Sequence, residues 1–267
     1  MSATITIDGC AVAYEEQGQG APVLLIHGLG SNRASWRLQV AALAERYRVI
    51  AYDVRGHGDS GRPQRGYSVR RLAADAAGLI RALGIDSVHL VGLSLGGMIG
   101  FQLAVDHPEL VASLVIVNSG PELVPRSLGD HLKLGTRRLL TRLLSPAQLA
   151  KILSPRLFPA PEQAPLREEF GASMAAMDPV IYRRLLRALI GWSVTDRLAV
   201  VRCPVLVVSG DRDYTPVAHK QAYMRHLADA RLVVMDDAGH AAPLERPEPF
   251  NDHLLEFLSA VAAVDAA

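Results

Sequence analysis

The stretch from Val88 to Gly97, which reads Val-His-Leu-Val-Gly-Leu-Ser-Leu-Gly-Gly, constrains this chain more than any other. An apolar run rich in strand-forming residues ends at Gly92, and the apolar residues after Ser94 recur at helical spacing. The pattern predicts a strand, a tight turn and a helix, with Ser94 in the turn. Such a turn brings neighbouring chain close to the serine, so the residues two before and two after it must be small. We interpret Ser94 as a nucleophile; the alternative is a glycine-rich turn with an incidental serine.

The bulk properties indicate a soluble enzyme-sized chain. It has 267 residues and a formal net charge of +1, which gives no case for nucleic acid or an anionic membrane surface as partner. A small molecule is therefore the expected partner. Residues 1–8 lack the features of a signal peptide and no apolar run reaches membrane-span length, so a cytoplasmic location is expected. Cys10 and Cys203 cannot make a disulfide framework, and neither lies in a metal-binding pattern.

Strand and helix patterns alternate along most of the chain. Residues 4–7 and 12–15 alternate apolar and polar around Asp8-Gly9, which predicts an antiparallel hairpin at the edge of a sheet. Continuous apolar runs predict buried strands, with helical patterns between them. Strands that alternate with helices indicate a mostly parallel sheet covered on both faces. The runs are 22–26, 47–52, 88–92, 114–117, 204–208 and 232–235.

The alternation stops between residues 121 and 196, where helical patterns and prolines occur without a convincing strand. We therefore predict a core domain of residues 1–120 and 197–267, with an all-helical insertion at 121–196. The insertion carries eleven Lys and Arg against seven Asp and Glu. This excess favours a carboxylated substrate, although solvated helix faces are the commoner cause of such charge runs.

The loops that follow parallel strands share one edge of the sheet, where open α/β folds place their sites. Of the nine histidines, His27, His57 and His240 fall on this edge. A nucleophilic serine needs a base within hydrogen-bond reach, and His240 lies on a glycine-containing loop that can deliver its ring to Ser94. His27 and His57 are interpreted first as structural histidines, with His27 also a candidate for the substrate pocket.

The base needs an acid to fix its tautomer, and Gly210-Asp211-Arg212-Asp213 follows a predicted strand. We favour Asp213, because Asp211 stands where turn-capping side chains bond their own backbone; Glu122 is a third candidate. The oxyanion of an acyl-transfer intermediate needs preorganised donors. The backbone N–H groups of Leu29 and Leu95 are the candidates.

The pocket that selects the substrate is predicted to lie under the helical insertion. Trp192, Met174 and Met177 are candidates to line it, with ordinary core packing as the alternative for each.

Taken together, these motifs resemble the α/β-hydrolase fold superfamily over the whole chain. The resemblance implies an eight-stranded sheet, a helical cap inserted after the sixth strand at about 121 to 196, and hydrolysis without a cofactor. Residues 92–99 resemble the branch of 3-oxoadipate enol-lactonases and small carboxylesterases. The motifs that carry it are His27-Gly28-Leu29-Gly30, Asp53 to Ser60, Gly92 to Gly97, Gly210 to Asp213, and Gly239-His240 followed by Glu245-Arg246-Pro247.

The expected activity is hydrolysis of a small carboxylic ester or lactone through an acyl-enzyme on Ser94. The resemblance extends to haloalkane dehalogenases, but those use an aspartate nucleophile where this chain has Ser94. Carbon-carbon bond hydrolases remain open, although they usually carry Asn where this chain has Leu93. A haloperoxidase or perhydrolase and a non-catalytic small-molecule receptor also share the core.

Overall fold

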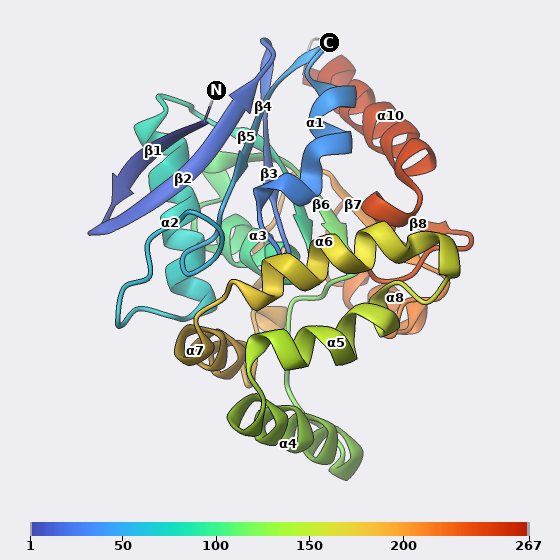
Figure 1. Cartoon of the computed structure of the whole chain (residues 1–267). Helices are drawn as coiled ribbons and strands as arrows, with labels where there is room; N and C mark the ends of the chain where they lie inside the picture. Colours follow the sequence, from blue (N-terminus) through green and yellow to red (C-terminus); the bar gives the residue numbers. More distant parts are fainter. Residues whose placement is uncertain (1, 266–267) are drawn as a thin grey trace.

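An eight-stranded sheet runs through the computed structural model, which describes residues 2–265 (Figure 1). The strand order is β1-β2-β4-β3-β5-β6-β7-β8. The first two strands form an antiparallel hairpin at one edge, and the strands from β4 to β8 pair in parallel. The predicted mostly parallel sheet and its edge hairpin are therefore confirmed. The strands are β1 Ser2–Ile7, β2 Cys10–Gln17, β3 Ala21–Ile26, β4 Tyr47–Tyr52, β5 Val88–Leu93, β6 Val111–Val117, β7 Val205–Gly210 and β8 Ala230–Met235.

Helices cover both faces of the sheet because the central strands are apolar on both faces. On β3, Leu24 and Ile26 pack with α2 and α3, whereas Val23 and Leu25 pack on the other face with α1 and α10. None of the helices in the described residues is long and apolar enough to cross a bilayer. The helices are α1 Arg37–Leu43, α2 Val69–Ala82, α3 Leu95–Asp106, α4 Leu128–Leu143, α5 Pro146–Leu157, α6 Ala164–Ala175, α7 Pro179–Leu189, α8 Val217–Met224, α9 Ala242–Glu245 and α10 Pro247–Asp265.

The run 232–235, predicted as a buried strand, is instead partly exposed. It lies in β8, which is the last strand of the sheet and pairs only with β7. Val234 is 42% exposed. An edge strand has one neighbour, so its apolar side chains need not be covered on both faces.

Residues 121–196 contain α4 to α7, and the turns between these helices are short. The two ends of the stretch meet at an isolated antiparallel bridge between Glu122 and Ser193. Figure 1 shows α4 as the outermost of these helices, at the end of the molecule farthest from β1 and β2. These helices therefore form one layer beside the carboxyl ends of the strands.

The turn between β5 and α3 is closely packed against β3. Ser94 has φ of 54° and ψ of −109°. A Cβ on Gly92 would lie 2.3 Å from the carbonyl oxygen of Gly96, and a Cβ on Gly96 would lie 2.0 Å from that of Ile26. No side chain fits at either position, which is the reason for the spacing of the two glycines around Ser94.

Two buried histidines join the loops that follow β3 and β4. The Nδ1 of His27 donates to the Gly28 carbonyl (2.8 Å), and its Nε2 accepts from the N–H of Val54 (3.0 Å). The Nε2 of His57 accepts from the N–H of Gly30 (3.2 Å), and the two rings meet edge to face at 4.9 Å. Because burial disfavours the charged ring, the pKa of His27 falls to about 4 and that of His57 to about 3. Both rings are neutral in the folded protein at neutral pH.

The first prediction concerns Gly96. We expect Gly96→Ala to lower the free energy of unfolding by about 3 kcal/mol, because the new methyl group meets backbone that cannot move freely. Gly171 in α6 is the matched control, since a Cβ there would contact nothing within 4 Å. Gly171→Ala should raise stability by up to about 1 kcal/mol. Equal effects of the two changes in urea unfolding would contradict the proposed close packing.

The second prediction concerns acid stability. The unfolded chain binds protons at His27 and His57 near the ordinary pKa of 6.5, while the folded protein does so only near 4 and 3. The free energy of unfolding should therefore fall as the pH is lowered below about 6.5, by about 2 kcal/mol for each ring at about pH 5. In urea unfolding at about pH 7 and about pH 5, His57→Gln should reduce this loss. The same change at the exposed His131 should not, and an undiminished loss in His57→Gln would refute the assignment.

Candidate functional site

Ser94 is held at the carboxyl end of β5 by bonds on both sides of its peptide unit. The N–H of Ser94 donates to the Val117 carbonyl (3.0 Å), and the carbonyl of Ser94 accepts from the Ser119 hydroxyl (2.6 Å). The side chain is half-buried. The turn geometry therefore presents the hydroxyl at the predicted edge of the sheet.

The predicted base and acid contact each other. The Nδ1 of His240 lies 2.8 Å from Oδ1 of Asp213, whose side chain is fully buried. Asp211 instead accepts a hydrogen bond from the N–H of Ala238 (3.0 Å), in the loop after β8, so it joins two loops rather than capping only its own turn. Glu122 pairs with Arg126 at the base of the helical layer. Of the three candidate acids, Asp213 alone reaches the histidine.

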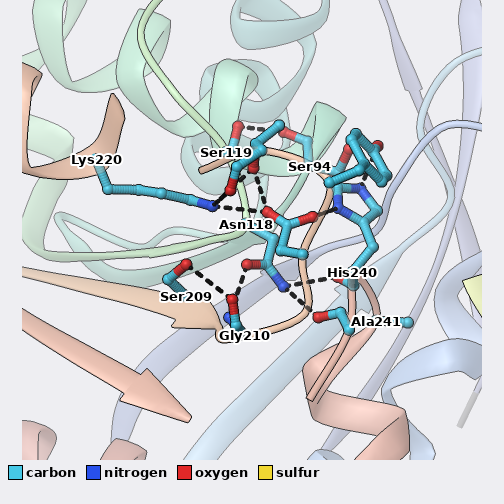
Figure 2. Close-up of polar contacts among 12 residues, drawn as sticks. Ser94, Asn118, Ser119, Ser209, Gly210, Lys220, His240 and Ala241 are labelled. Carbon is cyan, nitrogen blue, oxygen red and sulfur yellow. Dashed lines mark hydrogen bonds and ion pairs between the residues drawn. The ribbon is translucent and has the colours of Figure 1, made fainter. Parts of the chain in front are cut away.

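Asn118, which the sequence analysis missed, fixes the two loops that carry this pair (Figure 2). Its Nδ2 donates to the carbonyls of Gly239 and His240 (both 2.9 Å), and its Oδ1 accepts from the N–H of Gly210 (3.0 Å). Asn118 is the first polar residue after the apolar run 114–117. The rule that places sites at strand ends could have identified it.

A second carboxylate supports the histidine loop from the other side. Glu245 accepts hydrogen bonds from the N–H groups of Gly239 (3.0 Å) and Ala241 (2.9 Å), which flank His240. Gln163, in the helical layer, donates to the same carboxylate (3.2 Å). The backbone at His240 is thus held by both Asn118 and Glu245.

A buried lysine is the second partner of Asp213, and the sequence offered no signal for it. The Nζ of Lys220 contacts Oδ2 of Asp213 (2.6 Å) and both the carbonyl and hydroxyl oxygens of Thr215 (2.6 and 2.7 Å). Its side chain is 1% exposed. Burial by itself raises the pKa of Asp213, but hydrogen bonding and charge interaction with His240, together with Lys220 and Thr215, hold it below its ordinary value. Asp213 is ionised at neutral pH.

Tyr214, which the sequence analysis also missed, contacts the ring nitrogen of His240 that does not face Asp213. Its hydroxyl lies 2.8 Å from Nε2 of His240, and the two rings stack at 4.2 Å. The hydroxyl also interacts with the Ser94 side chain. The ring is 66% exposed. Ser94 and His240 are therefore linked through this phenol.

The two predicted oxyanion donors lie beside Ser94. A Cβ on Gly28 would be 3.6 Å from Cβ of Ser94, so the loop that contains Leu29 passes directly by the serine. Leu95 is the first residue of α3, where a backbone N–H has no partner within the helix. Among the described residues, no backbone carbonyl outside regular helices and strands accepts from Leu29 or Leu95.

The four predicted pocket residues differ in position. Met174 of α6 is buried and lies 3.5 Å from where a Cβ of Gly30 would be, over the loop beside Ser94. Met177 is buried in the main core. The Trp192 indole N–H donates to Gln102 (2.7 Å), which ties residue 192 to α3.

His27 does not line the pocket, so that prediction is wrong. Its ring is fully buried and both nitrogens bond to backbone. Its hydrogen bonds to Gly28 and Val54 instead join the loop after β3 to the loop after β4.

Comparison with known proteins agrees with this arrangement. Residues 23–253 match the model of the alpha/beta hydrolase family. The chain is 33% identical over 250 residues to the RutD protein of Azorhizobium caulinodans, which is named provisionally as a carbamate hydrolase, covering 91% of this chain and 93% of that protein. It is 30% identical over 259 residues to 3-oxoadipate enol-lactonase 2 of Acinetobacter baylyi, covering 95% and 94%.

A solved structure extends the similarity to three dimensions. The crystal structure of the enol-lactonase from Burkholderia xenovorans LB400 superposes with a TM-score of 0.89 and 26% identity, over 96% of this chain and 100% of that one. These relatives are named as hydrolases, and the family model spans the parallel strands from β4 to β8, most of β3, and Ser94, Asp213 and His240. The chain therefore belongs to the alpha/beta hydrolase family.

Proposed function

We propose that this protein is a serine hydrolase that cleaves a small carboxylic ester or lactone through an acyl-enzyme intermediate. Ser94 is the nucleophile, His240 the general base and Asp213 the acid that orients the base. The observation that carries the proposal is the 2.8 Å contact between His240 and Asp213 beside a serine in a strained turn. The two unpaired amides of Leu29 and Leu95 support acyl transfer in particular.

In the first half of the reaction, His240 takes the Ser94 proton at Nε2 while the serine oxygen attacks the carbonyl carbon. The carbonyl oxygen becomes an oxyanion, and the N–H groups of Leu29 and Leu95 donate to it. Collapse of this intermediate breaks the bond to the alcohol oxygen. His240 gives its proton to that oxygen, leaving an acyl group on Ser94; for a lactone, the alcohol stays attached to the acyl group.

In the second half, His240 removes a proton from water, which attacks the acyl carbon and forms a second oxyanion. Collapse releases the carboxylic acid, and Ser94 recovers its proton from His240. A carbamate passes through the same steps with a carbamoyl group in place of the acyl group. The similarity to the RutD protein makes carbamates the second substrate class to test.

Tyr214 must move during this cycle, because its hydroxyl occupies the nitrogen that serves as the base. The exposed ring has room to swing away from the stacked histidine. We infer that an entering substrate displaces the phenol, after which the Ser94 hydroxyl bonds directly to His240.

The third prediction tests the nucleophile and acid. Ser94→Ala should lower kcat for p-nitrophenyl esters by about ten-thousandfold or more, and a fluorophosphonate probe should label Ser94 in the native protein but not in the variant. Asp213→Asn should cost about ten-thousandfold, since His240 loses the partner that sets its tautomer.

Asp211→Asn is the matched control for the acid, because its carboxylate accepts from the backbone N–H of Ala238 and is not in contact with the imidazole of His240. It should leave kcat within about tenfold of native. Full turnover by Ser94→Ala, or equal losses in the two aspartate variants, would refute the roles proposed here. Turnover of lactones or carbamates above that of simple esters would identify the natural class.

A cation near the site suggests which esters are preferred. Arg137 of α4 interacts with the hydroxyls of Tyr182 and Tyr214. Within residues 2–265, no carboxylate is among the ionisable groups that act on this guanidinium. Arg137 is exposed and its charge acts on Tyr214, which in turn contacts Ser94 and His240, so we infer that it receives a carboxylate at the far end of the substrate.

The fourth prediction follows from this cation. Arg137→Gln should lower kcat/KM for a half-ester of a dicarboxylic acid by about tenfold to a hundredfold, chiefly through KM. The matched neutral ester should be affected by less than about threefold. Arg138→Gln, at an exposed neighbouring position, is the control. Equal losses for the two esters would show that Arg137 does not select the charge.

A further inference from the structure

The outer face of α4 carries a row of exposed leucines. Leu128, Leu132, Leu139 and Leu143 are 90%, 73%, 53% and 70% exposed. Their spacing places them in one stripe along a single side of the helix. We call these four residues the leucine stripe. Large apolar side chains aligned in this way on a soluble surface indicate a contact with an apolar partner.

The opposite side of α4 faces the protein. Thr141 is buried, and its carbonyl accepts from Arg183 of α7 (3.4 Å). Arg137 interacts with Tyr182 of the same helix. The helix is therefore packed by one face, the leucine stripe is exposed, and α4 lies at the outer end of the molecule (Figure 1).

The charged residues of α4 are mostly basic. The helix carries Lys133, Arg137, Arg138 and Arg142 against one acid, Asp130. The Asp130 carboxylate is used at the helix start, where it accepts from the N–H groups of Arg126 (3.2 Å) and Ser127 (3.0 Å). In the described part of the chain, no ion pair involves Lys133, Arg138 or Arg142. The leucine stripe is thus flanked by Arg138 and Arg142, which have no ion-pair partner among the described residues, and by Lys133, whose charge interacts with Asp130.

We propose that α4 docks on an anionic lipid surface, with the leucine stripe at the boundary of the acyl chains and the flanking cations on the headgroups. An interfacial helix has this combination of an apolar stripe and Lys or Arg beside it. A second copy of this chain fits less well. Its own Lys133, Arg138 and Arg142 would face those of the first copy with no acid to pair them.

The net charge of +1 predicted no membrane partner, and this proposal replaces that expectation. A lipid surface responds to charges within a Debye length of it, so the local excess on α4 decides the interaction rather than the total. The proposal also goes beyond the hydrolase activity, because docking through α4 does not require turnover.

The fifth prediction is tested by co-sedimentation of the whole protein with vesicles. The native protein should pellet with phosphatidylcholine vesicles that contain phosphatidylglycerol, less with phosphatidylcholine alone, and should be released by salt. Leu132→Ser/Leu139→Ser should weaken binding by about tenfold or more. Arg138→Gln/Arg142→Gln should weaken binding to anionic vesicles by about tenfold or more and leave binding to neutral vesicles unchanged.

The matched control is Val200→Ser/Val234→Ser, which removes two other apolar side chains, 44% and 42% exposed, from outside α4. It should bind as the native protein does. Circular dichroism and turnover of a soluble ester should be native in the leucine variant, so that lost binding is not lost folding. Unchanged vesicle binding in the leucine variant would overturn the proposal. A second result would also overturn it: light scattering that shows a dimer of the native protein and a monomer of the leucine variant. The leucine stripe would then be the contact between two copies of this chain.

Discussion

The contact between the first turn of α3 and the end of β3 governs the rest of this structure. The backbone of Gly96 lies against the carbonyl of Ile26 so closely that no side chain can stand between them. This approach forces Ser94 into a left-handed conformation and exposes its hydroxyl. It also places the Leu95 amide beside the loop that contains Leu29. The proposed nucleophile and the proposed oxyanion donors thus depend on the same packing contact.

The position of His240 depends on the buried carboxylate of Asp213, which contacts both His240 and Lys220. Asp213 gives one oxygen to His240 and the other to Lys220, so neither oxygen is left without a partner. A buried carboxylate is costly unless it is paired and hydrogen-bonded, and Lys220 supplies a permanent counter-charge. Hydrogen bonds from His240, Lys220 and Thr215 hold the pKa of Asp213 below its ordinary value, and in the proposed mechanism the ionised aspartate stabilises the charged form of His240.

The helix α4 connects two surfaces with different tasks. Its inner face brings Arg137 to the tyrosines near the site, and its outer face presents the leucine stripe. A small change in how α4 packs on α7 would alter both at once.

The sequence by itself determined the sheet, its edge hairpin and the turn at Ser94, because each depends on local spacing. The run from Val88 to Gly97 defines strand, turn and helix without reference to the rest of the chain. The preference for Asp213 over Asp211 agrees with the contact of Asp213 with His240, but Asp211 bonds Ala238 in another loop rather than its own turn. Where local pattern failed, the reason was position in the sheet or depth of burial: residues 232–235 form an edge strand, and His27 lies beneath the site. Only the tertiary structure brought Asn118, Lys220 and Tyr214 to the same histidine and aspartate, since contacts between residues far apart in the chain leave no periodicity to read. It also decided which side of α4 faces solvent, because a helical stripe of leucines looks the same in sequence whether it is buried or exposed.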